Sequence, residues 1–337
     1  EEVREILADL GFKTLNEIVG RTDLLKQVSR GTSNLDDLDL SPLLVQADPG
    51  ENKRYSTTNL INEVPTSLDE KIYKDVKNLI DKKNSIEKTY EIKNTNRAIG
   101  TRLSHYIYKK FKNEKIENNL IKINLFGSAG QSLGAFGAKG LKLNIIGDAN
   151  DYVGKGLSGA TIVIKPPKEC DLISDQNTIM GNTVLYGATS GKLFASGQSG
   201  ERFAVRNSGA VAVIEGCDSN GCEYMTGGSV VILGKVGDNF GAGMTGGMAF
   251  IYDPKKEFEN YVNEKSIIWQ TVETDYWKNY LKTLISEHFK ETESKIANKI
   301  LNNFTNEVKK FQQVCPKEML DKLKNQISLK KNILKAI

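Results

Sequence analysis

The stretch from Leu120 to Tyr252 constrains the fold most, because a strand-sized apolar run followed by a glycine-rich turn recurs along it at nearly fixed spacing. Successive anchor glycines are 19, 32, 18, 19 and 19 residues apart, and the long interval holds an insertion between Pro166 and Met180. A period near 20 residues indicates stacked units that contact mainly their neighbours. The anchor glycines are Gly140, Gly159, Gly191, Gly209, Gly228 and Gly247.

The apolar runs (TIVI, VAVI, VVIL, AFIY) are short and rich in β-branched or aromatic residues, which indicates strands and therefore a β-solenoid. The third residue after each anchor glycine is apolar and is predicted to form an inward ladder: Leu143, Ile162, Phe194, Ala212, Val231 and Phe250. The second and fourth positions then form an outward apolar strip. We expect the C-terminal helices to cover that strip, which comprises Leu193, Ala195, Val211, Val213, Val230, Ile232, Ala249 and Ile251.

Helical periodicity flanks the repeat on both sides. Apolar spacing predicts helices near residues 3–10, 67–80, 99–111, 277–288 and 301–311, with a capping box at Ser67 and Glu70 and a strand at 89–93. Pro316 should end the last helix, ahead of a Lys-rich tail. The predicted domains are a helical linker region (1–118), the glycine-rich repeat (119–253) and C-terminal helices with a tail (254–337).

Charge and hydropathy exclude two classes of partner. The formal net charge is +4, and the lysines are spread over the chain without a compact basic stripe, so nucleic acid is not an expected partner. No run of about 20 apolar residues is available to span a bilayer, so a membrane is not expected either. The chain begins without methionine or a signal pattern, and we expect it to belong to a longer polypeptide.

The motifs that could support chemistry have simpler structural interpretations. Two G-x-G-x-x-G matches, at 154–159 and 241–246, precede strands rather than a helix, which favours turn glycines over a dinucleotide site. The cysteines, Cys170, Cys217, Cys222 and Cys315, lack ligand spacing and are interpreted as plain thiols. His105 and His288 lie on separate predicted helices. Arg202 and Arg206 could bind an anion, but hydrogen bonds to turn carbonyls are favoured.

Several long strings carry a family resemblance: FGSAGQSLGAF (126–136), GDANDYVGKGLSGATIVIKPP (147–167), GNTVLYGATSGKLFASGQSGERFAVRNSGA (181–210), GCEYMTGG (221–228) and NFGAGMTGG (239–247). They resemble the C-terminal G-x-G-x-G domain of the glutamate synthase large subunit. EEVREILADLGF, EIVGRTDLL and NRAIGTRLS are similar to the stretch that leads into that domain. The resemblance implies a mainly-β fold, a right-handed parallel β-helix (solenoid) with flanking α-helices at both ends.

The resemblance also implies a function. The parent enzyme would make two glutamates from glutamine and 2-oxoglutarate, using FMN and a [3Fe–4S] cluster, with FAD also possible. In that family the nucleophilic cysteine, the FMN barrel and the cluster cysteines all precede the region that this chain resembles. The chain is therefore expected to be a non-catalytic scaffold whose partners are the glutaminase and FMN-barrel domains of the same polypeptide. No catalytic, cofactor-binding or metal-binding residue is assigned to it.

The sequence also leads to an expected electron donor, an expected cellular location and two alternative functions. QVCPKEML and VNEKSIIWQTVETDYW look more like the ferredoxin-dependent type than the NAD(P)H type, so ferredoxin is the expected electron donor. The expected location is the plastid stroma (chloroplast) or the bacterial cytoplasm. Two alternatives stay open: a β-helical accessory subunit of the formylmethanofuran dehydrogenase type, and a free-standing β-solenoid interaction module.

Overall fold

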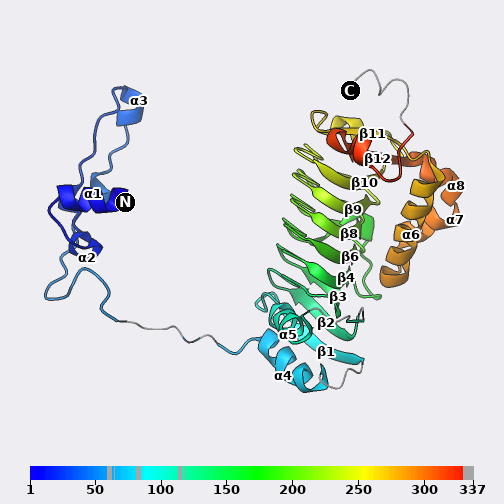
Figure 1. The fold of residues 1–337 in the computed structure, drawn as a ribbon, viewed down its shortest axis with the longest axis horizontal. Helices are drawn as coiled ribbons and strands as arrows, with labels where there is room; N and C mark the ends of the chain where they lie inside the picture. Colours follow the sequence, from blue (N-terminus) through cyan, green and yellow to red (C-terminus); the bar gives the residue numbers. More distant parts are fainter. Residues whose placement is uncertain (59–62, 64, 81–84, 113–115, 118, 329–337) are drawn as a thin grey trace. The chain divides into compact units, whose positions relative to one another are not determined.

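The computed structural model describes residues 1–58, 63, 65–80, 85–112, 116, 117 and 119–328, and the chain divides into two compact units, Glu1–Pro65 and Thr66–Ile337. The first unit contains short helices α1 (Glu2–Asp9), α2 (Leu15–Ile18) and α3 (Ser33–Asp36), with single 3₁₀ turns at Thr22–Leu24 and Ser41–Leu43 (Figure 1). Leu7 is its buried hydrophobic residue, whereas Ile6, Leu25 and Leu43 are exposed. This unit has little core of its own.

The second unit is built on a sheet of twelve described strands. Along the sheet the order is β1-β2-β3-β4-β6-β8-β9-β10-β12-β11 (Figure 1). The short β5 pairs with β3 and with the short β7. Strands β1 to β10 pair in parallel along this order, and β12 then pairs antiparallel with both β10 and β11. The bounds are β1 (Ile86–Ile92), β2 (Ile121–Ala129), β3 (Leu141–Ala149), β4 (Ser158–Lys165), β5 (Thr178–Met180), β6 (Ser190–Ala195), β7 (Gln198–Ser199), β8 (Ser208–Ile214), β9 (Thr226–Ile232), β10 (Gly246–Tyr252), β11 (Ile267–Thr271) and β12 (Phe311–Pro316).

The flanking helices follow the sequence periodicity closely at one end of the sheet and less closely at the other. Helix α4 (Leu68–Ile80) begins where Ser67 Oγ accepts from the Glu70 amide at 3.2 Å, which is one half of the expected capping box. Helices α5 (Thr101–Phe111) and α6 (Asp275–Thr292) match their predicted positions. The helix predicted over 301–311 is wrong: α7 (Lys295–Asn302) and α8 (Phe304–Glu307) are separate, a 3₁₀ turn follows, and Phe311 opens β12.

The predicted fold class, a mainly-β right-handed parallel β-helix with helices at its two ends, is wrong. The strands form one mixed sheet, mostly parallel, that ends in an antiparallel pair, and α6 lies along the sheet against β4, β6, β8 and β9 rather than at an end (Figure 1). This is an α/β arrangement. The physical reason is that the strands carry apolar side chains on both faces, so one face needs a helical layer. The division into domains at residues 118 and 253 stays a prediction.

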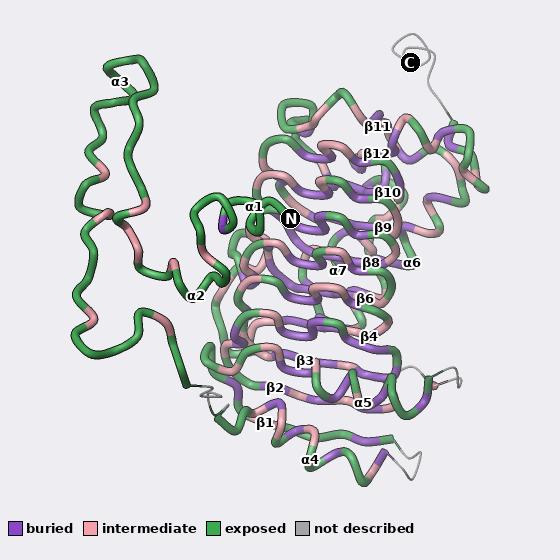
Figure 2. Tube along the Cα trace, turned by 60° about the vertical axis from the view of Figure 1, so that its left-hand side comes forward, coloured by how far each residue is buried: buried purple, intermediate pink, exposed green. Residues whose placement is uncertain are grey.

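Each face of the sheet has its own core. On one face, Leu143, Ile162 and Leu193 pack with residues of the glycine-rich connections, such as Leu157 and Phe203. On the other face, side chains at alternate strand positions pack against residues of α6 and α7. The strand residues are Val163, Phe194, Val213, Val231 and Phe250, and the helix residues are Leu281, Ile285 and Ile300. Figure 2 shows that buried segments recur in successive strands of the sheet. The second unit therefore has three layers: the glycine-rich connections, the sheet and the helices.

The strand register explains why half of the predicted inward ladder is wrong. The observed row runs Leu143, Ile162, Leu193, Ala212, Val230, Ala249, so Phe194, Val231 and Phe250 lie one residue later, on the helix-covered face. The register shifts at β-bulges near the starts of the strands, between Ser158 and Thr161, Ser208 and Val211, and Gly246 and Met248. A bulge takes up one residue and turns every later side chain to the opposite face.

The residues of the predicted outward strip likewise lie on both faces of the sheet. Val211 and Val213 do face the helices, whereas Val230 and Ile232 belong to the core under the connections, as do Leu193, Ala195, Ala249 and Ile251. The expectation that C-terminal helices cover an apolar face is confirmed, with different residues. Two ion pairs also join α6 to the sheet, Lys142 Nζ to Glu291 Oε2 at 2.5 Å and Lys192 Nζ to Glu287 Oε2 at 2.6 Å.

Candidate functional site

Three of the four thiol groups, those of Cys217, Cys222 and Cys315, lie in surroundings that suppress their reactivity. Burial raises the pKa of Cys217 and of Cys315 to about 12 and raises that of Cys222 well above its ordinary value. Cys170 is exposed and lies on the insertion between β4 and β5. Metal ligation and nucleophilic attack both require the thiolate, so the three buried cysteines are structural. Within the described ranges, no group of three or more His, Cys, Asp or Glu residues is placed to hold a metal ion.

The most deeply buried charged group is Glu215, directly after β8 and beneath α6. Its Oε1 accepts from Ser196 Oγ at 2.9 Å and lies 3.7 Å from His288 Nε2, and both Glu215 and His288 are fully buried. Burial favours the neutral carboxyl, but interaction with His288 and with the hydroxyls of Ser174 and Ser294 outweighs it, so the Glu215 pKa lies below its ordinary value. The Glu215–His288 pair lines neither of the two hollows described below. It joins the sheet to the covering helix.

The arginines singled out in the sequence are used within the fold. Arg202 Nη2 pairs with Glu223 Oε2 at 3.0 Å, and the Arg206 guanidinium lies 5.9 Å from the centre of the Tyr224 ring. The two arginines thus contact side chains of the next connection, and the expected hydrogen bonds to turn carbonyls are replaced by these contacts. Neither arrangement leaves a preformed anion site at 202–206.

Both G-x-G-x-x-G matches are turns, as the sequence predicts. Gly154, Gly156, Gly241 and Gly243 have φ between +62° and +73°, and strands β4 and β10 follow these turns. A dinucleotide site would need a helix there, whose free N–H groups bind the pyrophosphate. Instead the turn backbone bonds to neighbouring connections, for example Gly154 N to Leu133 O at 2.8 Å.

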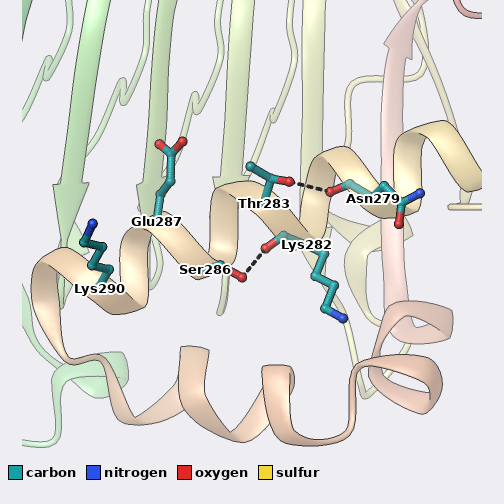
Figure 3. A pocket seen from close by; sticks show the side chains of 6 residues that line it. All are labelled: Asn279, Lys282, Thr283, Ser286, Glu287 and Lys290. Carbon is teal, nitrogen blue, oxygen red and sulfur yellow. Dashed lines mark hydrogen bonds between the residues drawn. The ribbon is translucent and has the colours of Figure 1, made fainter.

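A shallow hollow of about 400 Å³ lies along the outer side of α6, with lining residues that all come from this one helix (Figure 3). Thr283 Oγ1 donates to Asn279 O at 2.9 Å and Ser286 Oγ donates to Lys282 O at 2.8 Å, so both hydroxyls are satisfied within the helix. Glu287 is paired with Lys192 of the sheet. The side chains that line this hollow are therefore not joined into a catalytic group of acid, base and nucleophile.

A larger hollow of about 1040 Å³ is lined by residues of α4, of α5 and of the loop before α5. Figure 1 shows these two helices at the β1 end of the sheet. Its lining is cationic, with Arg97, Arg102, Lys109 and Lys110, and His105 also lines it. The sequence reasoning named His105 and missed the rest. The available signal was the spacing of Arg102, His105 and Lys109, which places them on one face of a predicted helix.

The comparisons with known proteins agree on a family. The model of the GXGXG motif family matches residues 69–317. The chain is 58% identical over 333 residues to the glutamate synthase [NADPH] large chain of Azospirillum brasilense, 99% of this chain and 22% of that protein. It is 44% identical over 321 residues to the glutamate synthase [NADH] of Schizosaccharomyces pombe, 94% of this chain and 15% of that protein.

The ferredoxin-dependent glutamate synthase 2 of Synechocystis sp. is 44% identical over 319 residues, 94% of this chain and 20% of that protein. The chain thus spans between 15% and 22% of the length of these three relatives. Among the described helices, none is long and apolar enough to cross a membrane. Since the family model covers most of the chain, including every described strand of the sheet from β1 to β12, the chain belongs to the GXGXG motif family.

Proposed function

We propose that this chain is the C-terminal structural domain of a glutamate synthase large subunit and serves as a scaffold between catalytic domains. The parent enzyme would be an oxidoreductase that makes two glutamates from glutamine and 2-oxoglutarate. The observation that supports this most is 58% identity over 99% of the chain to a large chain of that name. The layered core agrees with a scaffold, because connections, sheet and helices fill one another's apolar faces.

The cofactors that the resemblance implies do not fit this chain's own residues. An iron–sulfur cluster needs several cysteine thiolates, whereas Cys217, Cys222 and Cys315 are buried thiols with raised pKa values. FMN, a [3Fe–4S] cluster and any FAD are therefore proposed for the remaining domains of the parent enzyme. We propose those domains, the glutaminase and FMN-barrel domains, as the chain's partners, and the predicted division at residues 118 and 253 as its own domain plan.

The electron donor is proposed from two observations that point in different directions. The strings QVCPKEML and VNEKSIIWQTVETDYW favour ferredoxin, and ferredoxin-dependent synthases match at 44% identity. The relative named for NADPH matches at 58%. We propose a parent enzyme of one of these two types, located in a plastid stroma or a bacterial cytoplasm. Neither the accessory-subunit alternative nor the free-standing module accounts for the extent of identity to glutamate synthases, so neither is proposed.

The first test uses the chain alone. The purified 337-residue chain should form no glutamate from glutamine and 2-oxoglutarate with either reduced ferredoxin or NADPH, and should bind no FMN in a defined ratio. Glutamate formation, or stoichiometric FMN, would overturn the assignment of a non-catalytic scaffold.

The second test is a chimera. In the large chain of Azospirillum brasilense, the matching segment is replaced by this chain. We expect a folded enzyme that makes glutamate, because the scaffold faces are retained. A matched chimera carrying Gly228→Val, which disturbs the sheet, should lose activity along with stability. A chimera as stable as the parental large chain but inactive would contradict the proposed function.

A further inference from the structure

The lining of the hollow between α4 and α5 holds four arginine and lysine side chains and one carboxylate, that of Asp69. No hydrogen bond or ion pair engages the side chains of Arg97, Arg102 and Lys109 within the residues that the structure describes. Lys110 adds a fourth positive charge and lies 5.9 Å from the centre of the Tyr106 ring. An excess of positive charge in a hollow attracts anions from solution.

Two acidic groups near the hollow have other partners and also attract the Arg102 side chain. Asp69 is buried, and its two carboxylate oxygens accept from the backbone N–H groups of Gly100 at 2.6 Å and Arg102 at 2.9 Å. These bonds fix the start of α5. Glu70 Oε1 pairs with Lys74 Nζ at 2.9 Å. Asp69 and Glu70 offset part of the Arg102 charge, and the lining as a whole keeps an excess of positive charge that an external anion can balance.

The backbone that carries Arg97 is held on both sides. Asn96 O accepts from Gly130 N at 3.1 Å, Asn96 Oδ1 accepts from Lys93 N at 2.8 Å, and Ala98 N donates to Gln131 O at 2.9 Å. Arg102 is fixed by its place in the first turn of α5. Because the segment is ordered by these bonds, binding at Arg97 costs little further backbone entropy.

We propose that this hollow binds a small phosphate-bearing anion, independently of the scaffold role. Each guanidinium presents a planar fork of donors that matches phosphate oxygens, and lysine adds a point charge. A phosphate group carries nearly two negative charges at neutral pH, which suits a site with several cations better than the single charge of a carboxylate. The hollow, at about 1040 Å³, has room for more than one phosphate group.

Isothermal titration of the 337-residue chain with pyrophosphate at low ionic strength tests the proposal. The double variant Arg97→Gln/Arg102→Gln should raise Kd by at least about tenfold, because it removes two charge-assisted contacts. The double variant Arg97→Lys/Arg102→Lys should give an intermediate Kd, since it keeps the charge and loses the fork. Lys282→Gln, in the hollow on α6, is the matched control and should leave Kd unchanged. Both arginines are exposed, so the variants should keep the wild-type melting temperature.

Results of two kinds would overturn the proposal. One is the absence of pyrophosphate binding by the wild-type chain, or the same Kd in the Arg97→Gln/Arg102→Gln variant. The other is tighter binding of triglutamate than of pyrophosphate through the same arginines, which would assign the site to carboxylates. Binding that weakens with added salt and follows the arginine variants supports it.

Discussion

At the scale of single residues, glycine is required where strands of successive repeats approach closely. Gly228 has φ +84°, and a Cβ there would lie 2.3 Å from the carbonyl oxygen of Ala210. Both the left-handed backbone and the contact exclude a larger residue. The repeat in the sequence identified this position correctly.

Gly228→Val should therefore destabilise the chain by about 2 kcal/mol or more, measured by urea unfolding. Gly187→Ala is the control, because Gly187 has φ +63° with nothing within 4 Å of the added Cβ. That variant reports the backbone strain alone, about 1 kcal/mol. An equal loss in both variants would show that the contact with Ala210 contributes nothing.

The buried Glu215 carboxylate should make stability depend on acid pH. Its pKa is lowered in the folded state, so its charged form stabilises the fold above the ordinary glutamate value of 4.5, and this contribution is lost as the pH falls through the lowered pKa. In Glu215→Gln, the melting temperature should fall less steeply with acid over this range. Glu259→Gln, at an exposed carboxylate, should keep the wild-type slope. Identical slopes in wild type and Glu215→Gln would refute the idea.

At the scale of elements, α6 is stabilised mainly by its apolar side. Leu281 is fully buried against the sheet, so Leu281→Ala should cost about 2–5 kcal/mol in the free energy of unfolding. Ser286 lies on the exposed side of the same helix, and Ser286→Ala should change stability by no more than about 0.5 kcal/mol. Chemical denaturation of the two variants gives the comparison. A loss below about 1 kcal/mol for Leu281→Ala would mean that α6 does not cover a core.

Local periodicity predicted the elements better than it predicted their pairing. The strand at 89–93 and the helices α4, α5 and α6 follow from spacing alone, because each reflects one apolar face. Phe311 continues the helical spacing of Phe304 and Val308, yet it begins β12. The spacing of apolar residues does not show that residues 311–316 pair with β10 and β11, more than forty positions earlier in the chain.

The candidate site was less accessible to sequence reasoning for a similar reason. Arg102 and Lys109 belong to α5, and Arg97 lies on the loop before it, while the opposite wall of the hollow comes from α4. Helical spacing places the α5 residues on one side of their helix. It does not reveal that Asp69 of α4 bonds to the start of α5, or that the arginine side chains make no hydrogen bond or ion pair within the described residues.

At the scale of the whole molecule, the cores of the sheet come from residues after Pro65. The two hydrophobic clusters begin at Ile72 and Val163, with Leu68 packed against the first, and the unit Glu1–Pro65 contributes no residue to either in the described part of the chain. A shortened chain of residues 66–337 should keep the melting temperature of the full chain in calorimetry, within about 2 °C. The peptide 1–65 alone should show no cooperative transition. A larger fall on shortening would show that residues 1–65 stabilise the sheet.

The antiparallel pairing of β12 with β10 also limits how this protein can vary in length over evolution. Every parallel strand offers the same kind of edge for pairing. A duplicated repeat of about 20 residues can therefore join the sheet between two existing strands. The last edge of the parallel run is occupied by a strand of opposite direction, which a further parallel repeat cannot match. Growth by tandem duplication past β10 is therefore blocked, and each repeat added inside the sheet would also require a longer α6 to cover it.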